Sequence, residues 1–451
     1  ILTLDGVGEW ATTTVCEGQG ESIDIVKEIN FPHSIGLLYS AFTYYTGFKV
    51  NSAEYKVMGL APYGQPKFKN KIYDELIDVK EDGSFRLNMD YFNYATGLTM
   101  TNEKFSKLFG KPVRDPEKEQ LTQFHMDIAS SIQTVIEEIV LKITNSLSKS
   151  MKSKNLCLAG GVALNCVANG KILKNGLYKN IWIQPAAGDA GGALGAAIGF
   201  WHQELKNKRI VNKKDNMKGS YLGPNFKDSK IEEILNSINA NFKKYEENQL
   251  IEIVANEIAK GKTVGWFQGR MEFGPRALGS RSIIADPRNE KMQKELNLKV
   301  KFRESFRPFA PAVLKEDLFK WFELNYDSPY MLLVSEVKNE IKIKMSEKDK
   351  KLFGIDKLNI KRSKIPAVTH VDYTSRIQTV NSETNPKFSK LLKKFKDITS
   401  CPILVNTSFN VRGEPIVCDV MDAYRCFMST NLDILVCENF IMYKDQQFLK
   451  N

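Results

Sequence analysis

The pattern that most constrains the fold is a short apolar run that ends in glycines and leads into a helix. It occurs twice. Residues 155–166 (NLCLAGGVALNC) give a short buried strand, a Gly-Gly turn and the start of a helix. Residues 181–202 (IWIQPAAGDAGGALGAAIGFWH) repeat the pattern with a glycine-rich helix. Strands that alternate with helices in this way predict an α/β fold.

The remaining periodicity agrees with this fold class. The opening ILTLDGVGEWATTTVCEG predicts a strand, a tight glycine turn and a second strand, which together form a hairpin. Apolar residues at helical spacing predict helices in residues 31–48 and 121–151. The stripe of the second helix consists of Ile128, Ile132, Val135, Ile136, Ile139 and Ile143.

The length of 451 residues favours two domains, and the polar, lysine-rich residues 203–218 are the best linker candidate. We expect one α/β domain in residues 1–215 and a second in 216–451. The second half has its own strand runs, and a charged, mobile insertion is expected at 338–365. The runs are FAPAVL, YMLLVSEV, ILVNTSF and ILVCENFIMYK.

Composition limits the cellular setting and the partners. The 64 basic and 53 acidic residues give a net charge of +11, but the lysines are spread in diffuse runs. No dense basic block interleaved with aromatic residues occurs, so we expect no nucleic-acid partner. Seven cysteines without a C-x-x-C pair favour reduced thiols. Neither a signal peptide nor a membrane-spanning apolar stretch is visible, so we expect a cytoplasmic protein without membrane contact.

Three segments of the first half combine glycine turns with acidic or amide side chains. Asp5 lies in a hairpin turn, Gly160 and Gly161 precede Asn165, and Asp189 lies at the mouth of a helix. Each has a structural alternative: a turn residue for Asp5, tight packing for the glycines, and a helix cap for Asp189. Their order is typical of actin-like ATP-binding folds, in which two carboxylates face a metal or a phosphate.

The second half carries three segments rich in arginine. Residues 265–287 place Arg270, Arg276 and Arg281 among glycines, and guanidinium groups beside exposed backbone N–H groups suit a ligand with several anionic oxygens. The alternative is a set of surface cations and turn residues. Because each segment flanks a predicted buried strand, we expect an anion site. The other members are Lys301, Arg303 and Arg307 in KFRESFRPFAP, Arg376, and Ser408 and Asn410 in NTSFNVRGEP.

At this point a resemblance emerges. DGVGEW, EYKVMGLAPYG, LAGGVALNC, PAAGDAGGALGAA, GRMEFGPRALGSRSI, KFRESFRPFAP and NTSFNVRGEPIV, in this order, resemble the O-carbamoyltransferases of the nodulation and antibiotic-tailoring type. The resemblance covers nearly the whole chain, and GPRALGSRSI with FRPFAP is specific. It implies an actin-like, Kae1-like domain followed by a YrdC-like α/β domain. It also implies a reaction in which ATP and carbamoyl phosphate give carbamoyl-adenylate in the second domain. The carbamoyl group then passes to a hydroxyl of a small-molecule or glycan acceptor in the first.

The resemblance assigns roles to residues of this chain. Lys301, Arg307, Arg376 and Ser408 match the catalytic anion and adenylate pocket, with Arg276, Asn406 and Asn410 binding the cofactor beside them. Gly160, Gly161 and Asn165 match nucleotide contacts. Asp5 and Asp189 match two carboxylate ligands of a metal, Fe²⁺ or another divalent ion such as Mg²⁺.

One departure and several alternatives remain. The family's H-x-x-x-H pair precedes the D-G-x-G-E segment, and the histidines here (33, 125, 202 and 370) lack that spacing. We therefore expect an N-terminally incomplete first domain, and His33 and His125 to be ordinary helix residues. The alternatives are a tRNA threonylcarbamoylation protein and a nucleotide-gated binding module without chemistry. Hydrogenase-maturation carbamoylation would require acylphosphatase and C-x-x-C zinc segments, which this sequence lacks. The acceptor stays open, and a homodimer is a possible assembly.

Overall fold

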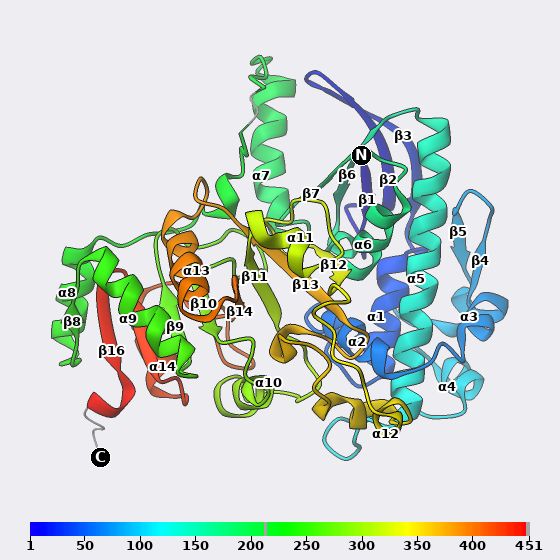
Figure 1. Ribbon diagram of the computed structural model, residues 1–451. Helices are drawn as coiled ribbons and strands as arrows, with labels where there is room; N and C mark the ends of the chain where they lie inside the picture. Colours follow the sequence, from blue (N-terminus) through cyan, green and yellow to red (C-terminus); the bar gives the residue numbers. More distant parts are fainter. Residues whose placement is uncertain (212–213, 448–451) are drawn as a thin grey trace. The chain divides into compact units, whose positions relative to one another are not determined.

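The computed structural model describes residues 1–211 and 214–447, and the chain divides into two compact units (Figure 1). Unit 1 contains Ile1–Lys213 and Lys351–Leu358. Unit 2 contains Lys214–Lys350 and Asn359–Asn451. The expected combination of helices with mixed β-sheets is confirmed.

Unit 1 is built on a five-stranded sheet of order β3-β2-β1-β6-β7. The predicted hairpin is confirmed, because β1 pairs antiparallel with β2, with Leu4 opposite Thr13. On its other side β1 runs parallel to β6, with Thr3 opposite Ala159. The residues that follow β1 and β6 therefore emerge at the same sheet edge. The strands are β1 (Leu2–Leu4), β2 (Ala11–Gln19), β3 (Ser22–Asn30), β6 (Asn155–Ala159) and β7 (Asn180–Ile183).

The long helix predicted for unit 1 is α5 (Gln123–Ser150). It begins with a capping box between Thr122 and His125, and all six residues of the predicted apolar stripe are buried. Helix α1 (Ile35–Tyr45) is shorter than predicted because Ser34 caps it by accepting from the Leu37 N–H. Helix α5 packs against α1 and α6, as Figure 1 shows. The other elements of unit 1 are α2 (Glu54–Leu60), α3 (Lys69–Glu75), β4 (Ile77–Val79), β5 (Phe85–Leu87), α4 (Glu103–Phe109), α6 (Cys166–Asn175) and α7 (Ala190–Gly199).

The segment Lys351–Leu358 belongs to unit 1 although the residues around it belong to unit 2. Lys67 Nζ lies 5.9 Å from the centroid of the Phe353 ring. Gly354, with φ of 56°, lies against α5, where an added Cβ would be 2.6 Å from Gln123 Oε1. The charged insertion expected at 338–365 is therefore, in part, a packing element of unit 1.

Unit 2 is built on a nine-stranded mixed sheet of order β12-β13-β11-β14-β10-β9-β15-β16-β8. Its pairs are antiparallel except for β11 with β13 and β9 with β15. The strands are β8 (Lys243–Lys244), β9 (Val264–Phe267), β10 (Arg281–Ala285), β11 (Ala310–Leu314), β12 (Leu333–Glu336), β13 (Thr374–Val380), β14 (Ile403–Ser408), β15 (Ile434–Cys437) and β16 (Phe440–Tyr443).

One strand prediction in unit 2 is wrong. The run ILVCENFIMYK forms two antiparallel strands, β15 and β16, because Glu438 adopts a φ of 47° and reverses the chain. This left-handed conformation is uncommon for glutamate, so the apolar pattern on both sides of Glu438 did not indicate a reversal there.

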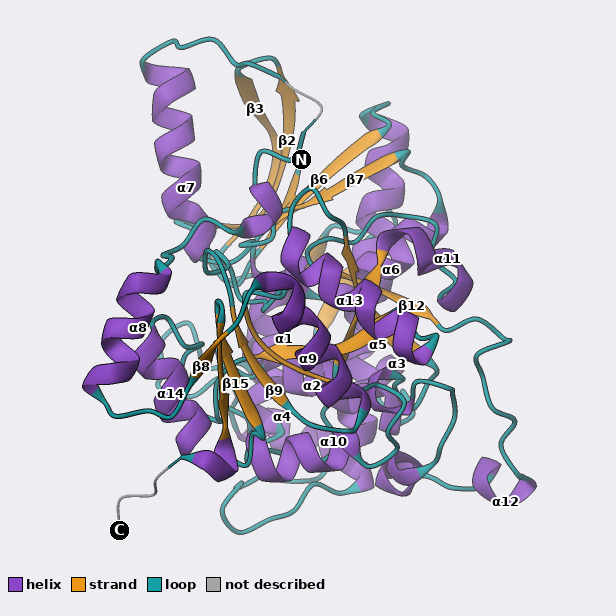
Figure 2. Cartoon of the chain, turned by 60° about the vertical axis from the view of Figure 1, so that its left-hand side comes forward, coloured by secondary structure: helices purple, strands orange, loops and turns teal. Residues whose placement is uncertain are grey.

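Helix α13 (Pro386–Thr399) covers part of this sheet and packs against α9 (Glu247–Ala259), as Figure 2 shows. Asn385 caps α13 by accepting from the Phe388 N–H at 3.0 Å. Phe388, Leu391, Leu392 and Phe395 form its buried face. The other helices of unit 2 are α8 (Asp228–Ser237), α10 (Met292–Glu295), α11 (Leu318–Trp321), α12 (Glu347–Lys350) and α14 (Val420–Met428).

Candidate functional site

The most compact group of predicted site residues surrounds Lys301. This residue follows a π-helical turn (Leu296–Val300), and its side chain is buried. Its Nζ donates to the carbonyl oxygens of Ser408 and Asn410, each at 2.7 Å, and lies 3.2 Å from Ser408 Oγ. It also contacts Asn410 Oδ1, which accepts from Ser408 Oγ at 2.7 Å. The fold thus brings Lys301 to Ser408 and Asn410, which lie more than 100 positions later in the sequence.

The electrostatics of this group favour a negatively charged ligand. Burial lowers the pKa of Lys301 well below its usual value, and Arg303 and Arg307 act in the same direction. Within residues 1–211 and 214–447, no carboxylate forms an ion pair with Lys301. Lys301 is therefore a buried amine without a carboxylate partner among the described residues, and a bound anion would favour its charged form.

The loop between Lys301 and β11 carries the second predicted cation, Arg307. Its guanidinium is mostly buried, and Nη1 lies 3.8 Å from Glu304 Oε2. Asn297 fixes the shape of the loop: its amide donates to the Arg307 carbonyl at 3.0 Å and accepts from Arg303 Nε at 2.7 Å. Asn297 was missed from the sequence because nothing near it signals a contact ten residues away.

Arg376 and Asn406 lie on one face of the nine-stranded sheet. Asn406 is opposite Ala310, and Gln378 is opposite Ala312, so Arg376, two residues before Gln378, shares their face. Ser408, two residues after Asn406, shares it as well. Arg376 Nε is buried and has no hydrogen-bond partner among the described residues. That all five predicted residues (Arg276, Lys301, Arg307, Arg376 and Ser408) face one cleft stays a prediction.

Asn406 itself holds a loop. Its fully buried amide donates to the Ala277 carbonyl at 3.1 Å and to Gln378 Oε1 at 2.6 Å. Gln378 in turn donates to the Leu278 carbonyl at 2.7 Å. These two amides fix the backbone that follows Arg276, a partly exposed residue, and the cofactor contact expected of Asn406 stays a prediction.

The backbone N–H groups of the same loop have an acceptor within the chain. Glu272 is buried, and its Oε1 accepts from the N–H groups of Leu278 at 2.6 Å and Ser280 at 2.8 Å. Its Oε2 accepts from the N–H of Arg281 at 3.1 Å. The expectation that these N–H groups bind a ligand is wrong, because an internal carboxylate already occupies them.

Two of the three arginines of residues 265–287 are also committed to the protein backbone. Arg281 is fully buried, and its guanidinium lies 3.6 Å from the centroid of the Phe267 ring. Arg270 donates to the carbonyls of Leu222 and Gly223. For Arg276, the third of them, the contact with an anion stays a prediction. The carbonyls bound by Arg281 Nη1 and Nη2 belong to Pro224, Gln268, Gly269 and Ser280.

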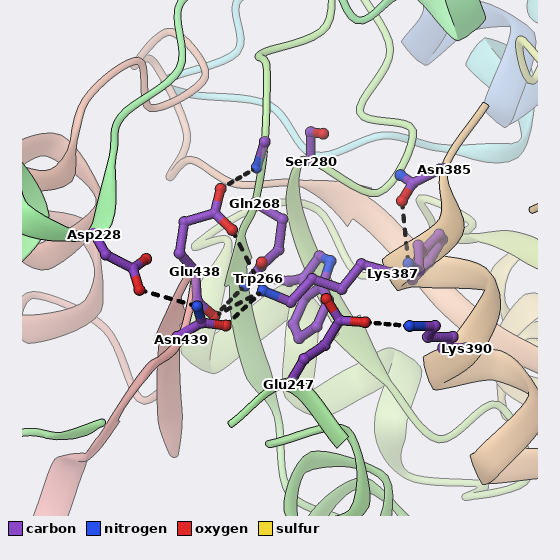
Figure 3. Close-up of polar contacts among 12 residues, drawn as sticks. Asp228, Glu247, Trp266, Gln268, Ser280, Asn385, Lys387, Lys390, Glu438 and Asn439 are labelled. Atoms are coloured by element: carbon purple, nitrogen blue, oxygen red, sulfur yellow. Dashed lines mark hydrogen bonds and ion pairs between the residues drawn. The ribbon is translucent and has the colours of Figure 1, made fainter. Parts of the chain in front are cut away.

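The start of this segment is anchored at the β15–β16 turn, as Figure 3 shows. Gln268 Nε2 donates to the Glu438 carbonyl at 3.1 Å. Lys387, at the start of α13, lies 3.3 Å from Glu438 Oε2 and 3.2 Å from Asn439 Oδ1. The Glu438 carboxylate also accepts from the Gly269 N–H. These contacts hold Glu438 in its left-handed conformation and fix the end of β9.

In unit 1, three of the residues predicted to bind metal and nucleotide, Asp5, Gly160 and Asp189, line one cavity of about 930 Å³, whereas Gly161 and Asn165 are not among its lining residues. Asp5 Oδ1 accepts from the N–H of Gly6 at 2.8 Å and of Gly161 at 3.2 Å. Gly160 has a φ of 86°, and an added Cβ would lie 2.2 Å from the Leu4 carbonyl oxygen, so only glycine fits. The parallel pairing of β1 and β6 thus brings the acidic turn and the glycine turn together.

The helix-cap alternative considered for Asp189 is not observed, whereas Asn165 does cap a helix. The exposed Asp189 makes no side-chain cap at α7, and its carboxylate has no partner in the described part of the chain. Asn165 does cap a helix, because its Oδ1 accepts from the Ala168 N–H at 3.2 Å. It also forms a reciprocal pair of hydrogen bonds with Gln133. The nucleotide contact expected of Asn165 stays a prediction.

That unit 1 holds a metal ion stays a prediction. Asp5 and Asp189 supply two carboxylates, but the residues that the structure describes contain no group of three His, Cys, Asp or Glu side chains placed to hold one ion. His33 lies before α1, not within it as expected, and its Nδ1 accepts from the Leu87 N–H. His125 is part of the α5 capping box. A complete site would therefore need further ligands.

Comparison with known proteins identifies the family. Residues 1–198 match the family model described as Carbamoyltransferase N-terminus, and residues 255–444 match Carbamoyltransferase C-terminus. The chain therefore belongs to the carbamoyltransferase family. Its relatives include nodulation protein NolO of Bradyrhizobium diazoefficiens, 36% identical over 98% of this chain and 75% of its own length.

Two further relatives cover the chain nearly completely. An uncharacterized protein of Synechocystis sp. is 61% identical over 99% of this chain and 73% of its own length. Nodulation protein NolNO of Sinorhizobium fredii is 37% identical over 98% of this chain and 60% of its own length. A solved structure of full-length HypF in the phosphate- and nucleotide-bound form is similar over 44% of this chain and 22% of that one. Its identity is 16% and its TM-score is 0.29, a likeness too small to carry an argument. No helix in residues 1–211 and 214–447 has both the length and the apolar character needed to cross a membrane.

Proposed function

We propose that unit 2, as a YrdC-like domain, makes carbamoyl-adenylate from ATP and carbamoyl phosphate. The observation that carries this proposal is the buried Lys301, which binds Ser408 and Asn410 and has no carboxylate partner among the described residues. Arg303 and Arg307 increase the positive charge beside it. Cations fixed in a site with little water stabilise the charge that gathers on phosphate oxygens during phosphoryl and adenylyl transfer.

The balance of the reaction defines what this site must bind. Carbamoyl-adenylate contains one phosphorus atom, which comes from the α-phosphate of ATP. Water must therefore hydrolyse carbamoyl phosphate to carbamate and inorganic phosphate. An oxygen of this carbamate then attacks the α-phosphorus of ATP and expels pyrophosphate. Lys301 and Arg307 would bind the oxygens of the leaving pyrophosphate, and Arg376 and Arg276 would complete the pocket.

Transfer to the acceptor hydroxyl is proposed for the cavity of unit 1, as an actin-like, Kae1-like domain. Asp5 and Asp189 would supply two ligands of Fe²⁺ or another divalent ion, which polarises a carbonyl and lowers the pKa of a hydroxyl when bound. The Asp5 carboxylate is already oriented, because its Oδ1 is fixed by two backbone N–H groups while Oδ2 is left for a ligand.

Small-molecule substrates fit the surface better than nucleic acid does. The lysines of α13 are paired with acidic side chains: Lys390 with Glu247, and Lys394 with Glu252 at 2.9 Å. All seven cysteines are unpaired, which agrees with the cytoplasmic location that we propose.

The test is exchange of labelled pyrophosphate into ATP in the presence of carbamoyl phosphate. We expect exchange that depends on carbamoyl phosphate, and we expect Arg307→Ala to weaken transition-state binding by about 1.5–3 kcal/mol, because a charge-assisted hydrogen bond is lost. Lys394→Ala, which changes only an exposed ion pair, is the control and should retain wild-type exchange. A folded wild-type protein that shows no exchange would exclude the proposal.

A further inference from the structure

Phe302, between Lys301 and Arg303, combines two unfavourable features. Its backbone has a φ of 47°, in the left-handed region that a bulky side chain rarely adopts. Half of its side chain (50%) is exposed to solvent. The position would suit glycine, yet it holds a phenyl ring.

The neighbours of Phe302 dictate this backbone. The N–H of Lys301 donates to the Leu296 carbonyl at 2.8 Å, and its carbonyl accepts from the Arg412 N–H at 3.2 Å. The N–H of Arg303 donates to the Asn297 carbonyl at 3.0 Å. Because the backbones of Lys301 and Arg303 are both held by hydrogen bonds, Phe302 connects them in the left-handed conformation. The strain is thus built into the loop that positions Lys301.

No ring contact among the described residues compensates for this backbone strain. It has no aromatic or cation–π partner among the residues described in the structure. The other apolar and aromatic residues with positive φ in the described part of the chain are Met331, which is buried, and Tyr373, whose ring centroid lies 5.3 Å from Lys342 Nζ. Strain that persists without an internal contact is found mainly at sites where a ligand makes the contact.

We propose that Phe302 is a stacking platform for the planar base of a nucleotide whose phosphates bind at Lys301 and Arg307. This inference rests on the proposed function, because it assigns the base of the same ATP. Stacking on a phenyl ring suits any base, since every base offers a π face. Exposure alone would not support the proposal, because isolated exposed apolar residues are common. Phe319 is 58% exposed in α11 and lacks the strain.

The decisive variant is Phe302→Gly, because it separates a structural role from a ligand contact. Glycine accepts the left-handed backbone and removes an exposed ring, so we expect the melting temperature to stay the same or rise. We expect the Kd for ATP to increase about tenfold as the stacking contact is lost. The Kd for inorganic pyrophosphate, which has no base, should not change. Phe302→Trp should bind ATP at least as tightly as the wild type.

Controls make each outcome informative. Phe319→Ala should leave both dissociation constants unchanged, and Phe302→Asn, which also tolerates positive φ, replaces the glycine variant if that variant fails to fold. Unchanged ATP binding in the folded variants would overturn the inference. Equal weakening of ATP and pyrophosphate would overturn it too, because it would show that the loop, not the ring, is responsible. If the wild type binds pyrophosphate but ATP no more tightly, base stacking is excluded while the anion site stands. If it binds neither, the proposed function itself fails.

Discussion

The protonation state of the buried Lys301 determines how strongly its site can bind an anion. Four oxygens of Ser408 and Asn410 lie within hydrogen-bond distance of the Lys301 amine, and these contacts favour the ammonium form. Burial and the nearby arginines act against it and lower the pKa. The charge that an anion meets in this site therefore depends on pH in a range where an ordinary lysine would stay charged.

The sign of the pH dependence follows directly. Above the lowered pKa of Lys301 the amine is neutral, so the affinity for pyrophosphate should begin to fall at a pH below that of ordinary lysine titration. Between the lowered pKa and the unfolded value, the unfolded chain binds more protons, so this residue makes the free energy of unfolding rise with pH.

The measurement is the Kd of pyrophosphate against pH for the wild type and for Lys301→Arg, whose guanidinium stays charged. The titration of pyrophosphate itself is common to both proteins, so we expect the wild type to lose affinity more steeply toward alkaline pH. Parallel curves would show that Lys301 does not titrate in this range.

At the scale of elements, the loop between Glu272 and β10 is held on both sides. One buried carboxylate accepts three N–H groups, while Asn406 and Gln378 donate to two carbonyls. Each of these partners comes from outside the loop, so the loop has little freedom to relax when one partner is removed.

We expect Glu272→Ala to lower the free energy of unfolding by more than about 2 kcal/mol, because three buried N–H groups lose their acceptor. Urea denaturation measures the effect. Glu247→Ala is the matched control: it removes an exposed carboxylate paired with Lys390 and should cost less than about 1 kcal/mol. Similar losses in the two variants would contradict the role given to Glu272.

Elements with a strong period were predictable, and networks between elements were not. The stripe of α5 and the β1–β2 hairpin follow from local patterns of apolar residues and turns. The burial of Arg281 and its hydrogen bonds could not be predicted from such patterns, because its acceptors are backbone carbonyls, which every sequence has. Similarly, no local signal separates Asn406, which holds a loop, from Asn410, which contacts Lys301.

At the scale of the whole molecule, the two compact units are not two consecutive pieces of chain. Lys351–Leu358 returns from unit 2 and packs in unit 1, where Phe353 lies against Lys67. Sequence patterns indicate charge and hydropathy in this segment, but they do not indicate which unit receives it.

We expect Phe353→Ala to destabilise unit 1 by about 0.5–1 kcal/mol, because the partly exposed ring loses its cation–π contact. Hydrogen–deuterium exchange should become faster in the first turns of α5 and stay unchanged in α13. Phe319→Ala, which removes an exposed ring from unit 2, should not change exchange in α5. Faster exchange in α13 alone would contradict the assignment of Lys351–Leu358 to unit 1.

The returning segment also sets an order for biosynthesis. A ribosome that has completed residue 213 must still translate residues 214–350 before Lys351–Leu358 exists. At about 5–20 residues per second, this interval lasts roughly seven to twenty-seven seconds. During that time Lys67 and the start of α5, which contact Phe353 and Gly354 respectively, are open to chaperones and to other nascent chains. The first unit to emerge is therefore among the last parts of this protein to be finished.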